Sequence, residues 1–148
     1  AHRSAGKLFL GSYTFDPKTL KETYNEGIPF HSRPSALNGF YKYLPDATTY
    51  DSGLIRVTIY GTDTDGKEIV IGRGEAQMHI AADMTAFNIP IHYGISGVKA
   101  CRLCLMASSS IYMGDIEYED THVPTTAYPQ KGAYIGSSLW LNSLYLSY

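Results

Sequence analysis

The sequence predicts an all-β protein with the fold of a two-sheet antiparallel β-sandwich, or jelly roll. Short apolar runs rich in Val, Ile, Tyr and Phe recur along the chain, and Gly, Pro, Asn and Asp separate them. No segment has a 3.6-residue apolar period with capping residues at both ends. About seven strands separated by turns are typical of such sandwiches. We expect strands at residues 7–15, 35–44, 53–61, 68–78, 85–94, 99–108 and 137–148.

The chain length indicates one domain, residues 1–148. The charge and the apolar runs argue against nucleic-acid binding and against a membrane span. The net charge is −2 and no basic stripe is present, so the chain lacks the electrostatic footprint of a nucleic-acid-binding protein. No apolar run reaches the roughly 18 residues of a membrane span. The chain begins without Met or an apolar signal segment and ends in a predicted strand. We therefore expect it to be the C-terminal part of a longer protein.

One β-hairpin has a strong signal in the sequence. Asp65-Gly66 lies between two apolar runs, in IYGTDTDGKEIVI, and Asp-Gly is favoured where a tight turn needs positive φ. Asp63, Asp65 and Gly66 also match the start of a calcium loop, but the later ligands and the closing Glu of that loop are missing. We interpret the segment as a turn.

Two segments are too long and irregular for turns, residues 16–34 and 109–136. Connections of that length inside a compact domain are usually functional or mobile. The second segment contains an acidic cluster formed by Asp115, Glu117, Glu119 and Asp120. Such a cluster is typical of a solvated loop.

The two cysteines form CRLC, at Cys101 and Cys104. Their surroundings alternate as in a strand, where residues three apart lie about 10 Å apart on opposite faces. A disulfide needs Cα atoms within about 7 Å. We expect two unpaired structural thiols, with Cys101 facing inward beside Leu103 and Leu105 and Cys104 on the exposed face.

The strand faces separate core from surface. Ile55, Val57 and Ile59 make one face of their strand entirely β-branched, so this face is expected to pack inward. In FYKY, Lys42 should not be buried unpaired, which places Tyr41 and Tyr43 in the core. Alternation likewise assigns the inner face of the strand over residues 85–94 to Phe87, Ile89, Ile91 and Tyr93.

The opposite faces supply the candidate ligand-binding residues. If their strands are neighbours in one sheet, these side chains form a polar and aromatic surface, which suits a sugar as well as it suits plain solvent. Trp140 alternates with Leu139 and Leu141, and its position on the outer face or in the core stays open. The candidates are Lys42, Arg56, Tyr60, Asn88, His92, Arg102 and Trp140, with Thr58 beside them.

No catalytic motif is present. The chain has no G-x-S-x-G, no H-E-x-x-H and no phosphate loop, and its five histidines do not cluster at metal-ligand spacings. A glycosidase needs two carboxylates across a cleft, about 5–9 Å apart, and no second carboxylate can be placed opposite the acidic cluster from the sequence. We expect no catalytic residues and no metal site.

The order of motifs resembles the putative carbohydrate metabolism domain family from about residue 28 to the end. A segment of the form RP-x-x-L-x-G-x-Y-K-Y is matched by Arg33, Pro34, Leu37, Gly39, Tyr41, Lys42 and Tyr43. A closing strand of the form GS-x-L-x-V-D-x-L-x-L-x-Y is matched by Gly136, Ser137, Leu139, Leu141, Leu144, Leu146 and Tyr148, with Asn142 in place of Asp.

This resemblance implies a galactose-binding-type jelly roll from secreted or surface proteins of Bacteroidetes, typically preceded by an immunoglobulin-like domain. It implies an extracellular, cell-surface or periplasmic location, with a lipid anchor on the parent protein as one option. Asp at the position of Asn142 can help to hold a structural calcium ion in such modules, and Asn removes that charge. We therefore expect no cofactor.

Together these observations favour a non-catalytic carbohydrate-binding module that takes part in glycan use. An adhesive or structural module that binds a protein partner is the alternative. A glycoside hydrolase is the third reading, and it lacks a paired acid and base.

Overall fold

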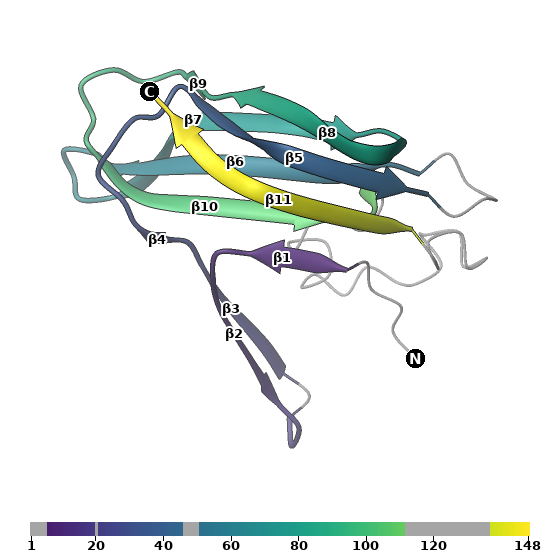
Figure 1. The fold of residues 1–148 in the computed structure, drawn as a ribbon. Coiled ribbons are helices and arrows are strands. Elements are labelled where there is room, and N and C mark those ends of the chain that lie inside the picture. The colour runs from purple at the N-terminus through teal and green to yellow at the C-terminus, as the bar shows by residue number, and fades with distance from the viewer. Residues whose placement is uncertain (1–5, 20, 46–50, 112–136) are drawn as a thin grey trace.

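The structure is a computed structural model that describes residues 6–19, 21–45, 51–111 and 137–148 (Figure 1). These residues form β-strands joined by turns and longer connections. Within them, no helix is long and apolar enough to cross a membrane. The strands are β1 (Lys7–Phe9), β2 (Gly11–Asp16), β3 (Lys21–Glu26), β4 (Ile28–Pro29), β5 (Ala36–Leu44), β6 (Gly53–Thr62), β7 (Glu68–Met78), β8 (Ala81–Pro90), β9 (His92–Tyr93), β10 (Ala100–Ser108) and β11 (Ser138–Ser147).

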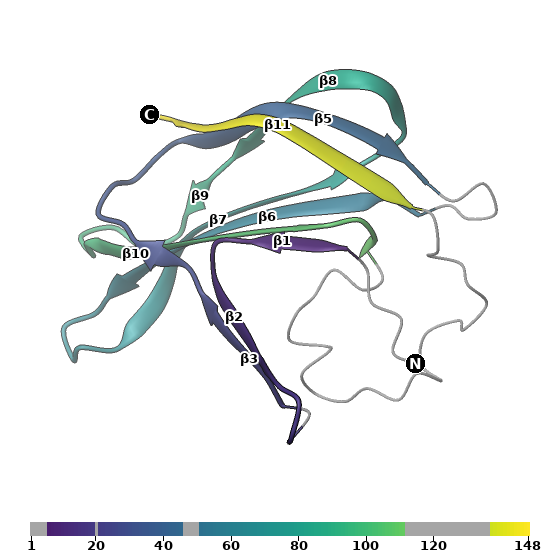
Figure 2. The same cartoon turned by 60° about the horizontal axis from the view of Figure 1, so that its bottom comes forward.

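Two sheets pack face to face, which confirms the predicted all-β antiparallel sandwich (Figures 1 and 2). The six-stranded sheet has the order β1-β10-β6-β7-β9, and β4 also pairs with β10. The three-stranded sheet has the order β11-β5-β8. Every strand pair is antiparallel. The chain therefore crosses between the two sheets after β4, β5, β7, β8 and β10.

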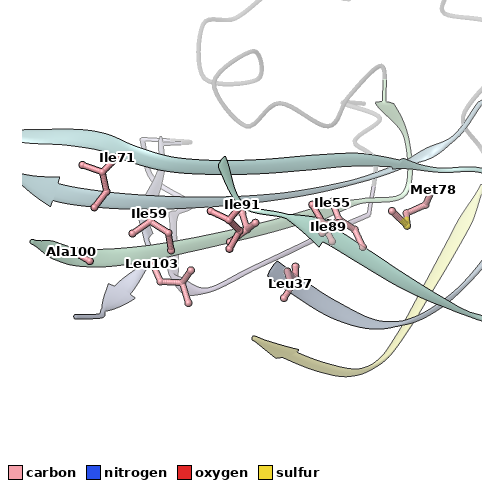
Figure 3. Close-up of a cluster of buried hydrophobic side chains, with 11 residues drawn as sticks. Leu37, Ile55, Ile59, Ile71, Met78, Ile89, Ile91, Ala100 and Leu103 are labelled. Carbon is pink, nitrogen blue, oxygen red and sulfur yellow. The ribbon is translucent and has the colours of Figure 1, made fainter. Parts of the chain in front are cut away.

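The core lies between the two sheets (Figure 3). Ile55, Val57 and Ile59 of β6 are completely buried, as their alternation with polar residues predicts. Leu37 and Ile89 reach the same cluster from the three-stranded sheet. The full cluster is Leu37, Ile55, Val57, Ile59, Ile71, Met78, Ile89, Ile91, Ala100, Leu103 and Ala107.

The tyrosine pair of β5 belongs to this core, as predicted. Tyr43 is completely buried and its hydroxyl donates to the carbonyl oxygen of Ser109 at 3.0 Å. Tyr41 is half-buried and meets Phe87 edge to face, with ring centroids 6.1 Å apart. These two rings fill the space between the sheets and do not face a ligand.

The N-terminal part differs from the prediction of one strand over residues 7–15. Gly11 has a φ of +136°, and the chain there leaves β1 and starts β2, which pairs with β3. Asp16 holds the turn between them, because its two carboxylate oxygens accept from the Lys18 N–H and the Thr19 hydroxyl, both at 2.9 Å. The β2–β3 hairpin extends away from the packed sheets (Figures 1 and 2). Residues 16–34, predicted to be irregular, thus contain β3 and β4.

The predicted strand over residues 85–94 is also two strands. β8 pairs with β5, whereas β9 pairs with β7 in the other sheet. Pro90 ends β8, since proline has no N–H to continue the ladder. The N–H of the next residue, Ile91, bonds to the Ser35 carbonyl at 2.8 Å, and this is where the chain changes sheets.

The Asp65-Gly66 turn is confirmed as the connection between β6 and β7. Gly66 has a φ of +80° and its N–H bonds to the Asp63 carbonyl at 3.1 Å. The Asp63 carboxylate accepts from the backbone N–H groups of Asp65 and Lys67, at 2.9 and 2.8 Å. The Asp side chain therefore organises a turn in this segment.

Both cysteines are free thiols, as predicted, but Cys101 does not take the inward position and Cys104, although on the outer face, is buried. A bulge between Ala100 and Arg102 displaces Cys101, so Ala100 takes the inward position and the Cys101 thiol lies 3.8 Å from Glu68. Cys104 is only 8% exposed. The segment at Gly27, which leads into β4, covers this part of the outer face, and the sequence pattern gave no sign of that cover.

We call β2, β3 and β4 with their connections the N-terminal arm. Replacing Gly27 with Ala tests how tightly this arm packs against β10. Gly27 has a φ of +90°, and a Cβ there would lie 2.8 Å from the Cys104 sulfur and 2.9 Å from the Leu103 carbonyl oxygen. Gly66 has a similar φ but open space around it. In urea unfolding we expect Gly66→Ala to lower the unfolding free energy by about 1 kcal/mol and Gly27→Ala by about 3 kcal/mol. Equal losses would contradict this packing.

Candidate functional site

The outer face of the three-stranded sheet presents three exposed aromatic side chains. Phe40 is 43% exposed, Trp140 42% and Tyr145 57%. Polar side chains of the same strands lie among these rings. We name this surface the aromatic face, and it consists of Asn38, Phe40, Lys42, Asn88, Trp140, Asn142 and Tyr145.

Strand alternation puts these residues outside. Leu139 and Leu141 pack against the core, so Trp140 between them faces outward, which settles the alternative that the sequence left open. On β5, the inward Tyr41 and Tyr43 direct Phe40 and Lys42 to the same outer face. Burial of the leucines and tyrosines thus fixes the position of the exposed rings.

The register of the sheet arranges the aromatic face in three rows. Successive rows are two residues apart along β5, about 7 Å, so the face is about 14 Å long in the strand direction. Each row contains one aromatic ring. The rows are Trp140 beside Lys42, then Asn142 beside Phe40, then Tyr145, the buried Asn38 and Asn88 in that order across the sheet.

A bulge in β11 brings Tyr145 to this face. The register shifts between Asn142 and Tyr145, and Ser143 has a φ of +53°. Leu144 consequently points inward, and a Cβ at Gly39 would lie only 2.8 Å from its Cδ2 atom. The sequence contains a signal for this bulge, because the spacing of the apolar residues changes between Leu141 and Leu144.

Three polar contacts hold the aromatic face in place. The Lys42 ammonium lies 4.9 Å from the centre of the Trp140 ring, within the range of a cation–π interaction. The Asn88 amide donates to Asn38 at 2.5 Å, and the Asn38 amide donates to the Ser147 hydroxyl at 3.0 Å. Side chains fixed in this way lose little conformational entropy when a ligand binds.

Only part of the predicted ligand-binding set lies together. Lys42, Asn88 and Trp140 share the aromatic face. The predicted single surface is nevertheless wrong, because the remaining residues belong to strands of the other sheet and the periodicity of a strand does not show which sheet it joins. Those remaining residues are Arg56, Tyr60, His92 and Arg102, together with Thr58.

Arg102 was predicted to bind a ligand, but its side chain makes structural contacts instead. Its guanidinium pairs with Glu68, donates to the Glu26 carbonyl at 2.6 Å and lies 4.1 Å from the centre of the Tyr60 ring. Hydrogen bonding to Arg102 holds the pKa of Glu68 below its usual range, and burial raises the pKa of Tyr60. These contacts attach the end of β3 to the six-stranded sheet.

Arg56 is engaged in a similar way. Its Nε bonds to Glu75 at 2.6 Å, and its side chain is 21% exposed. Thr58, on the same face, is buried. His92 is exposed beside Arg73. The outer face of the six-stranded sheet is therefore dominated by ion pairs between its own side chains.

Asp51 is a buried carboxylate that serves the fold. It is 6% exposed and accepts from the Ser52 N–H and the Ser110 hydroxyl at 2.9 Å and from the Ser137 hydroxyl at 3.0 Å. Desolvation raises the pKa of the neighbouring Tyr43 to about 12. Hydrogen bonds satisfy both carboxylate oxygens, which is what a buried charge requires.

No metal centre is evident in the described part of the chain. There, His, Cys, Asp and Glu side chains do not gather in groups of three or more. The acidic cluster of Asp115, Glu117, Glu119 and Asp120 lies outside the described residues. Asn142, the position linked to calcium by resemblance, is on the exposed aromatic face opposite Phe40.

Comparison with known proteins identifies the family. The family model described as putative carbohydrate metabolism domain matches residues 3–119, so the chain belongs to that family. The match includes the Arg33–Tyr43 motif and the N-terminal arm, and it ends before the closing strand that suggested the resemblance. No curated protein sequence matches the chain.

A solved structure has the same fold. It is described as a putative glycoside hydrolase from Bacteroides thetaiotaomicron and aligns with a TM-score of 0.63 and 21% identity. The alignment covers 97% of this chain and 47% of that one, so this chain spans about half the length of its structural neighbour.

The structural role of Arg102 predicts a loss of stability on substitution. Arg102→Gln removes charge-assisted bonds to Glu68 and Glu26, and we expect a loss of about 2 kcal/mol in the free energy of unfolding at pH 7. Arg73→Gln, at a side chain that is 55% exposed, should cost under about 0.5 kcal/mol.

The stability difference between wild type and Arg102→Gln should depend on pH. Because the folded pKa of Glu68 lies below the ordinary 4.5, the ion pair contributes fully above pH 4.5 and is lost as the pH falls through the lowered value. The stability difference between wild type and Arg102→Gln should therefore shrink in acid urea titrations. A difference that is negligible at pH 7 would show that Arg102 does not hold the N-terminal arm.

Proposed function

We propose that this domain is a non-catalytic carbohydrate-binding module and that the aromatic face is its binding surface. The observation that supports this most strongly is the row-by-row placement of Trp140, Phe40 and Tyr145, all exposed, beside amide side chains. The family description supports a carbohydrate context for the protein.

The chemistry of the aromatic face suits a sugar. The C–H faces of a sugar ring are apolar and pack on aromatic rings, while its hydroxyls exchange hydrogen bonds with amides. Trp and Tyr are rigid, amphipathic anchors that give up little rotamer freedom on binding. Asn142 lies beside Phe40, and Asn88 lies in the same row as Tyr145 with Asn38 between them, so both amides can meet hydroxyls of a sugar placed on the rings.

A non-catalytic role is supported by the structural contacts of three described carboxylates. Glu68 and Glu75 are paired with Arg102 and Arg56, and Asp51 is buried under serine hydroxyls. Hydrolysis of a glycoside needs one protonated and one ionised carboxyl group across the scissile bond. None of these three is placed on the aromatic face.

Further parts of the proposal concern the parent protein. The module acts outside the cytoplasm, at the cell surface or in the periplasm, within a longer chain that has an immunoglobulin-like domain before it. The affinity of a single module for a glycan is weak, and multivalent presentation raises the overall binding strength. Binding requires no calcium.

A second candidate function is adhesion to a protein partner. The same surface has apolar neighbours, because Leu44 and Met84 on β5 and β8 are 36% and 47% exposed. Exposed apolar groups next to one another are typical of protein interfaces. A protein partner would bury these side chains together with the rings, whereas a sugar would contact the rings and amides.

A glycan array followed by calorimetry tests the proposal. We expect wild type to bind a defined glycan, with equal affinity in calcium and in EDTA. Trp140→Ala should weaken binding at least about tenfold, roughly 1.4 kcal/mol, as for an interface anchor, with a smaller loss for Phe40→Ala. His92→Ala is the matched control, since His92 is exposed on the other sheet.

Circular dichroism should show that each variant is folded. If wild type binds no glycan on the array, the protein-partner function replaces this one. If binding survives Trp140→Ala and Phe40→Ala but is lost in His92→Ala, the binding surface is on the six-stranded sheet.

A further inference from the structure

A basic cleft lies at the end of the sandwich, between the segment before β5 and the connection from β9 to β10. It is an open cleft with a volume of about 670 Å³. Three of its lining residues, His31, Arg33 and Lys99, have basic side chains, and none of its lining residues has a carboxylate.

Three backbone carbonyls at the cleft already have side-chain partners. Arg33 donates to the carbonyls of Val98 and Ile95, at 2.9 and 2.7 Å. The Ala100 carbonyl lies 3.2 Å from Nδ1 of His31. Because an acceptor that has a partner competes less for a ligand, donors and positive charge dominate the chemistry left in the cleft.

Arg33 is held in place before any ligand arrives. Its guanidinium lies 4.5 Å from the centre of the Tyr93 ring, and the Tyr93 hydroxyl donates to the Pro34 carbonyl at 2.8 Å. A guanidinium has five N–H donors, and the two contacts to Val98 and Ile95 use one on each terminal nitrogen. As far as contacts with the described residues go, three donors are left for an oxyanion, in the planar guanidinium that suits a carboxylate.

The geometry also fixes the tautomer of His31. A carbonyl oxygen can only accept, so its contact with Nδ1 requires that this nitrogen hold the proton. Nε2 is the ring nitrogen left for a ligand, and it donates to an oxyanion when the ring is in its doubly protonated, cationic form. The Lys99 ammonium and the Ser96 hydroxyl are further donors in the lining. The cleft thus combines one fixed guanidinium, one ammonium, one imidazole and one hydroxyl.

We propose that this cleft binds the anionic group of an acidic glycan, a carboxylate or a sulfate carried on a sugar. The inference rests on the proposed carbohydrate-binding function and extends it by naming the class of glycan. The cleft lies at the end where β11 finishes, since Ser35, two residues after Arg33, donates its N–H to the Ser147 carbonyl at 2.7 Å. The aromatic face meets neutral sugar rings, and the cleft selects for negative charge.

Calorimetry with a matched pair of probes tests this. The first probe is a galacturonic acid oligosaccharide and the second is its methyl ester, which has the same rings without charge. A sulfated galactose oligosaccharide distinguishes sulfate from carboxylate as the preferred anion. We expect wild type to bind one of the two anionic probes at least about tenfold more tightly than the methyl ester, as expected for charge-assisted bonds.

Variants assign the difference to the cleft. Lys99→Met and His31→Gln should remove most of the preference for the anion and leave methyl ester binding unchanged. Arg33 is kept, because it holds the β9–β10 connection. Lys18→Met, in the exposed turn of the β2–β3 hairpin, makes the same charge change away from the cleft and should have no effect.

The outcomes separate this proposal from the function it rests on. Equal affinity for anionic and neutral probes, or equal losses in Lys99→Met and Lys18→Met, overturns the cleft and leaves the aromatic face standing. Retention of the anion preference in Trp140→Ala, with unchanged ester affinity, supports the cleft and contradicts the aromatic face. Failure of every probe to bind overturns the cleft, and the neutral glycans of the array then decide the function.

Discussion

The β-branched inner face of β6 is the constraint on which the rest of the structure depends. Ile55, Val57 and Ile59 are completely buried, and the three-stranded sheet supplies Leu37 and Ile89 to cover them. Because side chains alternate along a strand, this burial also decides what each sheet shows to solvent. The outer face of the six-stranded sheet is occupied by ion pairs, and that of the three-stranded sheet by aromatic rings and amides.

The family motif serves this packing more than it serves a ligand. Pro34, Leu37 and Tyr43 are buried, and Gly39 allows Leu144 and Phe87 to approach the backbone closely. Arg33 fixes the β9–β10 connection, and Tyr41 packs edge to face on Phe87. Lys42 is the motif residue that reaches the aromatic face, where it lies beside Trp140. The motif therefore identifies the fold, and the evidence for function comes from Lys42, Arg33 and the residues around the motif.

Local patterns made much of the fold predictable. The strands over residues 53–61 and 68–78 and the turn between them are confirmed, because alternation and the Asp-Gly pair are signals within a few residues of sequence. The β2–β3 hairpin was not predicted, since KETYNE has no apolar face to reveal a strand. Cys104 was predicted to be exposed but is buried, because the segment at Gly27, distant in sequence, covers it.

The candidate site was predicted only in part for the same reason. Neighbouring residues indicate on which face of its strand each of Lys42, Asn88 and Trp140 lies. That β5, β8 and β11 join into one sheet depends on contacts between distant segments, which local sequence does not show. Arg56 and Arg102 have the same local pattern as Lys42 and lie on the other sheet. Tyr145 depends on a bulge at Ser143, and the basic cleft depends on the meeting of segments more than sixty residues apart.

Trp140 offers the most direct test of the central claim, because it is the single tryptophan of the chain and lies on the aromatic face. We would titrate the protein with a glycan that calorimetry shows to bind, and follow tryptophan emission and its quenching by acrylamide. Stacking of a sugar ring on Trp140 predicts a shift of the emission and protection from the quencher, both saturating with the calorimetric Kd. Saturated binding that leaves emission and quenching unchanged would contradict the account, since the sugar would then lie elsewhere.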